Sequence, residues 1–239
     1  MHWEKYPPDL LKHAARIPGG TALIDHLLNL LEIQDGQHLL DLSPGDGLVS
    51  AVVAREHDVK ITALASDAEM EAASESMIGH MGVSDRVSVI PGTPVAIPLP
   101  AEEFHRVFYI AHPFPIPATP GVIAEVHRML GPDALIGMAG PASMTNRPPE
   151  YMTNALREIE GGSFRTPAFT ALLYAQQGLH VVRAEYLPEA YDHWRQWLEK
   201  APKNGVPDTF RRAVIEDGGR WLSLGVIILR KPPRPTWAV

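Results

Sequence analysis

The 239-residue chain contains no cysteine, which excludes disulfides, cysteine-ligated zinc sites and thiol nucleophiles. It also has few basic residues: 21 Lys and Arg stand against 28 Asp and Glu, giving a net charge of −7. Binding to nucleic acid requires clustered cations that neutralise phosphates, and no such cluster occurs. A nucleic-acid partner is therefore not expected.

Long apolar runs are missing as well. The first residues have no apolar core of the kind found in signal peptides, and no later run is long enough to span a bilayer. We therefore expect a cytoplasmic protein without a membrane partner. The histidines His127, His180 and His193 lack the spacing of metal ligands, so no metal site is expected.

Strand-like apolar segments alternate with segments of helical periodicity over most of the chain. This alternation predicts an α/β fold: a doubly wound, mostly parallel sheet of seven strands, with helices on both faces. The predicted strands are 38–42, 59–65, 86–90, 105–111, 133–140, 179–187 and 221–229, the last two closing one edge of the sheet. The predicted helices are 9–16, 23–31, 48–56, 68–81, 121–130, 149–160, 167–177, 189–200 and 208–216, and residues 141–147 are expected to form a polar loop.

A glycine-containing turn follows the first predicted strand, at residues 43–47. Ligands of open parallel sheets bind beyond the carboxyl ends of the strands. Gly45 and Gly47 would let the backbone approach a ligand closely, and the next helix would point its N-terminus toward an anionic group. The alternative is a turn in which the glycines serve backbone sterics only.

The whole segment Leu39-Leu40-Asp41-Leu42-Ser43-Pro44-Gly45-Asp46-Gly47 resembles motif I of the class I (Rossmann-like) S-adenosylmethionine-dependent methyltransferases. The resemblance extends over about residues 20–140. It implies that Asp41 lies beside the amino end of the cofactor's methionine and that Gly45 and Gly47 lie under the cofactor. Ser43 replaces the first glycine of the motif.

Other positions depart from the family pattern, so the set of cofactor motifs is degenerate. Ala65 stands where the family usually has an acid that binds the ribose hydroxyls, and Ser66 and Asp67 follow it. Asp67 either replaces that acid or caps the next helix. Thr93 stands where the family's aspartate binds the adenine amino group, and His105 replaces another usual aspartate.

The resemblance implies S-adenosylmethionine as cofactor, S-adenosylhomocysteine as product and a small-molecule methyl acceptor. A general base is required when the acceptor must lose a proton. His112, just past the fourth predicted strand, is the candidate base, and a plain loop histidine is the alternative. Tyr109 either lines the methionine end of the site or packs within its strand.

We interpret residues 1–239 as one methyltransferase-like domain. Residues 1–20 would form an N-terminal lid, in which Trp3 and Tyr6 either cover the cofactor or simply pack. Residues 20–140 would bind the cofactor, and residues 141–239 would supply a substrate cap and the edge of the sheet. The proline-rich loops and aromatic residues are compatible with a homodimer.

Two other functions are consistent with the residues. The first is a catalytically inactive methyltransferase-like protein that binds a ligand or partner, as the altered Ala65, Thr93 and His105 suggest. The second is an NAD(P)-dependent oxidoreductase, because residues 45–50 nearly match G-x-G-x-x-G/A and Asp67 follows at a suitable distance. Ser50 at the last motif position is a departure that counts against it.

Overall fold

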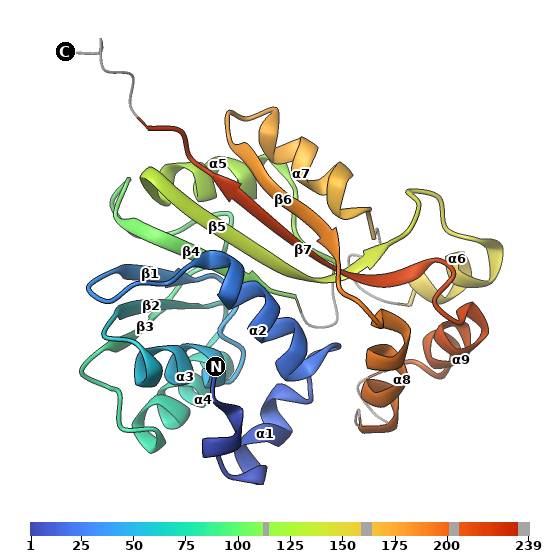
Figure 1. Ribbon diagram of the computed structural model, residues 1–239, viewed down its shortest axis with the longest axis horizontal. Coiled ribbons are helices and arrows are strands. Elements are labelled where there is room, and N and C mark those ends of the chain that lie inside the picture. The colour runs from blue at the N-terminus through green and yellow to red at the C-terminus, as the bar shows by residue number, and fades with distance from the viewer. Residues whose placement is uncertain (112–114, 159–163, 201–205, 234–239) are drawn as a thin grey trace.

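A seven-stranded sheet forms the central layer of the computed structural model (Figure 1). The structure describes residues 1–111, 115–158, 164–200 and 206–233. The strand order is β3-β2-β1-β4-β5-β7-β6. The strands are β1 (His38–Asp41), β2 (Lys60–Ala65), β3 (Val87–Pro91), β4 (Phe104–Ile110), β5 (Leu130–Ser143), β6 (His180–Tyr186) and β7 (Leu222–Arg230).

The first five strands pair in parallel, and β7 runs antiparallel to both of its neighbours, β5 and β6. The predicted mostly parallel sheet is thus confirmed. The predicted polar loop at 141–147 is wrong in its first part, because β5 continues to Ser143. The apolar strand β7 offers it a partner there, with Pro141 opposite Leu224 and Ser143 opposite Leu222.

Helices cover both faces of the sheet (Figure 1). Within β1, Leu39 belongs to one hydrophobic cluster and Leu40 to the other, because successive side chains of a strand point to opposite faces. Helices α5 and α7 pack on the Leu40 side, and α1 to α4 pack on the Leu39 side. The helices are α1 (Pro8–Ala14), α2 (Gly20–Leu31), α3 (Leu48–Glu56), α4 (Ala68–His80), α5 (Pro120–Met129), α6 (Glu150–Leu156), α7 (Pro167–Ala175), α8 (Ala190–Lys200) and α9 (Asp208–Asp217), with a short 3-10 helix, η1, at Trp3–Lys5.

The corner between α9 and β7 is built around a buried carboxylate. Asp217 is 1% exposed. Its Oδ1 accepts hydrogen bonds from the Tyr151 hydroxyl at 2.8 Å and the Trp221 amide at 3.0 Å. Its Oδ2 accepts from the amides of Trp221 at 3.1 Å and Leu222 at 3.0 Å. These contacts join α6, α9 and the start of β7.

None of the helices in the described ranges is both long enough and apolar enough to cross a membrane.

Candidate functional site

A cavity of about 580 Å³ opens beyond the carboxyl ends of β1, β2 and β4. Its walls come from the turn after β1, the start of α4, the end of β4 and the segment that ends α1. This is where a parallel sheet is expected to bind a ligand. Six of the predicted site residues line it: Asp41, Ser43, Gly45, Ser66, Asp67 and Tyr109.

The two glycines of the turn have different surroundings. Gly45 lines the cavity with φ +59°, and a Cβ added there would have no atom within 4 Å. Gly47, with φ +84°, precedes α3, and a Cβ there would lie 2.9 Å from the Ser74 backbone. Gly45 therefore leaves space beside the cavity. The prediction that Gly47 lies under a ligand is not supported by its position, because Gly47 instead lets α3 and α4 pack closely.

Asp41 ends β1 and is 1% exposed. Its Oδ1 accepts a hydrogen bond from the Ser43 amide at 3.0 Å, and its Oδ2 accepts one from the Ser50 hydroxyl at 2.7 Å. Burial raises the pKa of Asp41 to about 6, and the two neutral donors offset this rise only in part. A cationic group placed in the cavity would stabilise the ionised carboxylate.

Ser43 joins the turn to the end of β4. Its hydroxyl accepts a hydrogen bond from the Ile110 amide at 2.8 Å and donates one to the Ile110 carbonyl at 3.1 Å. A glycine at this position could make neither bond. The serine therefore holds the carboxyl ends of two neighbouring strands in register at the cavity.

Asp67 begins α4 as its N-cap. Its carboxylate accepts hydrogen bonds from the Met70 amide at 2.9 Å and the Ser66 hydroxyl at 3.0 Å. The bond from the Met70 amide holds the pKa of Asp67 below its usual range. The carboxylate is exposed and also lines the cavity, so the capping role does not remove it from the site.

Two other predicted positions, Thr93 and His105, lie away from the cavity lining. Thr93 forms a tight turn with Ala96 and is not among the residues that line the cavity. Its predicted contact with an adenine is therefore not supported by its position. His105 lies near the amino end of β4, where its Nδ1 accepts a hydrogen bond from the His38 amide at 3.1 Å. The candidate base His112 lies outside the described residues.

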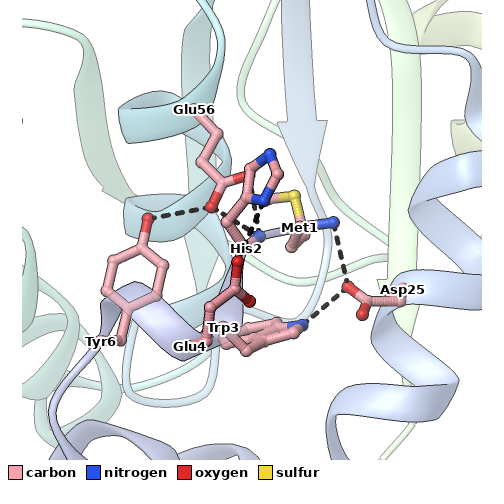
Figure 2. A network of polar contacts seen from close by, with 7 residues as sticks. All are labelled: Met1, His2, Trp3, Glu4, Tyr6, Asp25 and Glu56. Atoms are coloured by element: carbon pink, nitrogen blue, oxygen red, sulfur yellow. Dashed lines mark hydrogen bonds and ion pairs between the residues drawn. The ribbon is translucent and has the colours of Figure 1, made fainter.

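The N-terminal aromatic residues make polar contacts with neighbouring helices (Figure 2). The indole of Trp3 donates to Asp25 of α2 at 2.7 Å, and the Tyr6 hydroxyl donates to Glu56 of α3 at 3.3 Å. Neither aromatic ring lines the cavity. The structure thus favours simple packing over an aromatic lid for these two residues.

Sequence reasoning missed the wall that α1 and the residues after it provide. His13 lies 2.5 Å from Asp46, measured from the imidazole Nδ1 to the carboxylate Oδ2. Arg16 approaches the same oxygen at 3.5 Å. The two ends of this contact are 33 residues apart in sequence, so no local motif marks it. In the sequence, Asp46 is recognisable only as part of the glycine turn.

The charge of the cavity favours a cationic ligand over an anionic one. A lining rich in carboxylates attracts positive charge and repels a diphosphate group. Among the described residues, no group of three or more His, Asp or Glu is placed to hold a metal ion. The described lining carries the carboxylates of Asp41, Asp46, Asp67 and Glu69, the guanidinium of Arg16 and the imidazole of His13.

No protein-family model matches the chain, and no curated protein matches its sequence. Solved structures do match it in fold. The geranyl diphosphate C-methyltransferase from Streptomyces coelicolor A3(2), in complex with geranyl diphosphate and S-adenosylhomocysteine, has a TM-score of 0.74 at 12% identity, over 89% of this chain and 77% of that one.

Two further structures widen the comparison. Phosphoethanolamine N-methyltransferase 2 from Haemonchus contortus, with S-adenosylhomocysteine bound, has a TM-score of 0.74 at 15% identity, over 90% of this chain and 54% of that one. The [4+2]-cyclase SpnF has a TM-score of 0.72 at 17% identity, over 90% of this chain and 82% of that one. The chain therefore has the fold of the class I methyltransferases.

Proposed function

We propose that the chain binds S-adenosylmethionine in this cavity and transfers its methyl group to a small-molecule acceptor, leaving S-adenosylhomocysteine. The observation that carries the proposal is that Asp41 lines a cavity beside the open glycine turn and that its buried carboxylate is hydrogen-bonded only by neutral donors in the described structure. Two of the solved structures with this fold were determined with S-adenosylhomocysteine bound.

The residues present fit this cofactor. S-adenosylmethionine carries an ammonium and a sulfonium, which suit a cavity rich in carboxylates. Asp41 would hold the ammonium, Gly45 would leave room for the ligand beside the turn, and Asp67 would accept from the ribose hydroxyls. When bound, the cofactor supplies an activated methyl group, so the protein mainly has to position the acceptor.

We propose that residues 141–239 supply the acceptor side of the site, while residues 20–140 bind the cofactor. Several apolar side chains of this region belong to the core: Met152, Phe164 and Tyr174 are buried. Met144 and Phe169 remain 44% and 38% exposed. Exposed apolar side chains in this part of the chain suit a small organic acceptor.

A second candidate function is ligand binding without methyl transfer. Ala65 offers no polar side chain at the end of β2, and Thr93 does not line the cavity. Each missing hydrogen bond weakens binding by about 0.5–1.5 kcal/mol. The [4+2]-cyclase among the solved structures has the same fold under a name that is not a methyltransferase.

Calorimetric titration of the purified protein with S-adenosylhomocysteine, S-adenosylmethionine and NADH tests the proposal. We expect micromolar binding of the two adenosyl ligands and none of NADH. Gly45→Arg should abolish binding, because the arginine side chain would fill the cavity. Gly36→Arg is the matched control: Gly36 also has positive φ (+80°) and no atom within 4 Å of an added Cβ, but it does not line the cavity.

Failure of both adenosyl ligands to bind the wild-type protein would refute the proposal. Binding of NADH alone would support the oxidoreductase instead. Binding of S-adenosylmethionine without turnover of any acceptor would favour the second candidate function.

A further inference from the structure

The cavity contains a histidine–aspartate pair that the proposed function does not yet use. The Nδ1 of His13 lies 2.5 Å from the Oδ2 of Asp46, and both residues line the cavity. A carboxylate can only accept a hydrogen bond, so the proton between these atoms belongs to the imidazole. A neutral His13 therefore carries its hydrogen on Nδ1, and its Nε2 is left with a free lone pair.

Asp46 is itself held in place. Its Oδ1 accepts a hydrogen bond from the Leu48 amide at 3.3 Å, in the first turn of α3. Its Oδ2 accepts a hydrogen bond from the guanidinium of Arg16 at 3.5 Å, in addition to the contact with His13. A base oriented by a carboxylate, which is in turn held by the backbone, is the arrangement that many enzymes use to fix a histidine tautomer.

The wall that carries His13 is also fixed from its other side. The indole nitrogen of Trp197, on α8, donates a hydrogen bond to the Arg16 carbonyl at 2.6 Å. Gly19, just beyond, packs so closely that an added Cβ would lie 2.7 Å from the Leu23 side chain. The end of α1 is therefore clamped between the glycine turn and α8. This keeps the imidazole at a constant position in the cavity.

Three other titratable groups of the lining are poorer proton acceptors. Both oxygens of Asp41 already accept hydrogen bonds, and its proposed partner is the cofactor's ammonium. Burial raises the pKa of the Tyr109 phenol, so it stays protonated. The carboxylate of Asp67 caps α4.

We propose that His13, oriented by Asp46, is the general base of the methyl transfer; the proposal rests on the proposed function. The lone pair of the acceptor atom attacks the methyl carbon, and the bond from carbon to sulfur breaks with its electrons on sulfur. The proton of the acceptor moves to Nε2 of His13. Asp46 stabilises the resulting imidazolium, which returns the proton to solvent, since the His13 side chain is 30% exposed.

The experiment begins with the affinity of the wild-type protein for S-adenosylhomocysteine, so that failure of the proposed function is recognised separately. Turnover of S-adenosylmethionine is then measured with phenol, whose oxygen must lose a proton, and with benzoate, whose oxygen carries none. The variants are His13→Gln, Asp46→Asn and, for comparison, His112→Gln. Carbethoxylation of the histidines by diethyl pyrocarbonate is followed by mass spectrometry with and without S-adenosylhomocysteine.

We expect His13→Gln to lower kcat with phenol about 100-fold, while turnover of benzoate and the Kd of S-adenosylhomocysteine change less than about threefold. S-adenosylhomocysteine should protect His13 from carbethoxylation but leave the exposed His80, outside the cavity, unprotected. The proposal would be overturned if His13→Gln lowered kcat equally with both acceptors, or if only His112→Gln lowered kcat. If neither acceptor is turned over, lack of protection of His13 overturns it and protection supports it.

Discussion

Two regions of the molecule are each built around a buried aspartate, and they differ in what surrounds the carboxylate. Asp41, at the end of β1, and Asp217, at the corner between α9 and β7, are both 1% exposed. Asp217 accepts from the Tyr151 hydroxyl and from two backbone amides. Asp41 accepts one hydrogen bond from an amide and one from a hydroxyl.

An ionised carboxylate has about four acceptor positions. Three protein donors surround Asp217, and the Trp221 amide contacts both of its oxygens, so the carboxylate joins α6, α9 and β7. The two contacts at Asp41 leave capacity on the side of the cavity. Equal burial therefore does not imply an equal role: the number of protein donors separates a structural carboxylate from one that can receive a ligand.

The largest effect is expected from Asp217→Ala. The substitution leaves the buried amides of Trp221 and Leu222 and the Tyr151 hydroxyl without their acceptor, at about 1–3 kcal/mol for each unsatisfied group. The free energy of unfolding should fall by about 3 kcal/mol or more in urea denaturation. Asp85→Ala, at a side chain 78% exposed, is the control and should change it by less than about 0.5 kcal/mol. Similar stability of the two variants would show that the corner is not held by Asp217.

Asp41→Asn should weaken ligand binding without lowering the stability of the fold by a comparable amount. A hydrogen bond to a charged group contributes about 1.5–3 kcal/mol, so affinity for S-adenosylmethionine should fall about 10- to 150-fold in calorimetry. The free energy of unfolding at neutral pH should stay within about 1 kcal/mol or rise, because the variant no longer buries a charge. Strong destabilisation with unchanged affinity would reverse the roles assigned to the two aspartates.

The affinity for the ligand should vary with pH as the carboxyl group of Asp41 gains or loses its proton. Burial raises its pKa to about 6, so the ligand-free protein holds a proton there at lower pH. An ammonium ligand requires the ionised form, and affinity should therefore fall about tenfold for each pH unit below about 6. Titrations from pH 5 to 8 measure this slope, and Asp41→Asn should remove it. A slope that persists in the variant would assign the titration to another group.

The smallest effect is expected from Ser50→Ala. Ser50 is fully buried, and its hydroxyl lowers the pKa of Asp41 by donating to Oδ2. Loss of this bond, about 0.5–1.5 kcal/mol, should move the midpoint of the binding profile upward by about half to one pH unit. An unchanged midpoint would show that another donor, such as water, replaces the hydroxyl.

Most of the secondary structure could be predicted from the sequence, because apolar segments with the period of a helix or a strand alternate along the chain. The helix 48–56 has the predicted bounds, and the predicted cap Asp67 binds the amide of Met70. The end of β5 could not be predicted. Pro141 reads locally as a loop residue, and only pairing with the distant strand β7 makes it part of a strand.

The candidate site was predicted where it depends on one local turn and missed where it depends on long-range packing. Asp41, Ser43 and Gly45 lie within five residues of each other and line the same cavity. His13 and Arg16 had no signal in sequence, since their partner Asp46 lies about 30 residues further on. The resemblance to the family implies that Thr93 contacts the adenine, but its tight turn keeps it off the cavity lining.

The sequence by itself determined the class of fold, the order of strands and helices along the chain and the position of the glycine turn. These follow from periodicity and from local backbone chemistry, which act over a few residues. Tertiary structure alone decided that α1 walls the cavity and that His13 meets Asp46. It also decided that Asp41 keeps free acceptor capacity while Asp217 does not. Such properties depend on which donors and charges long-range packing brings to a carboxylate, and no local pattern encodes them.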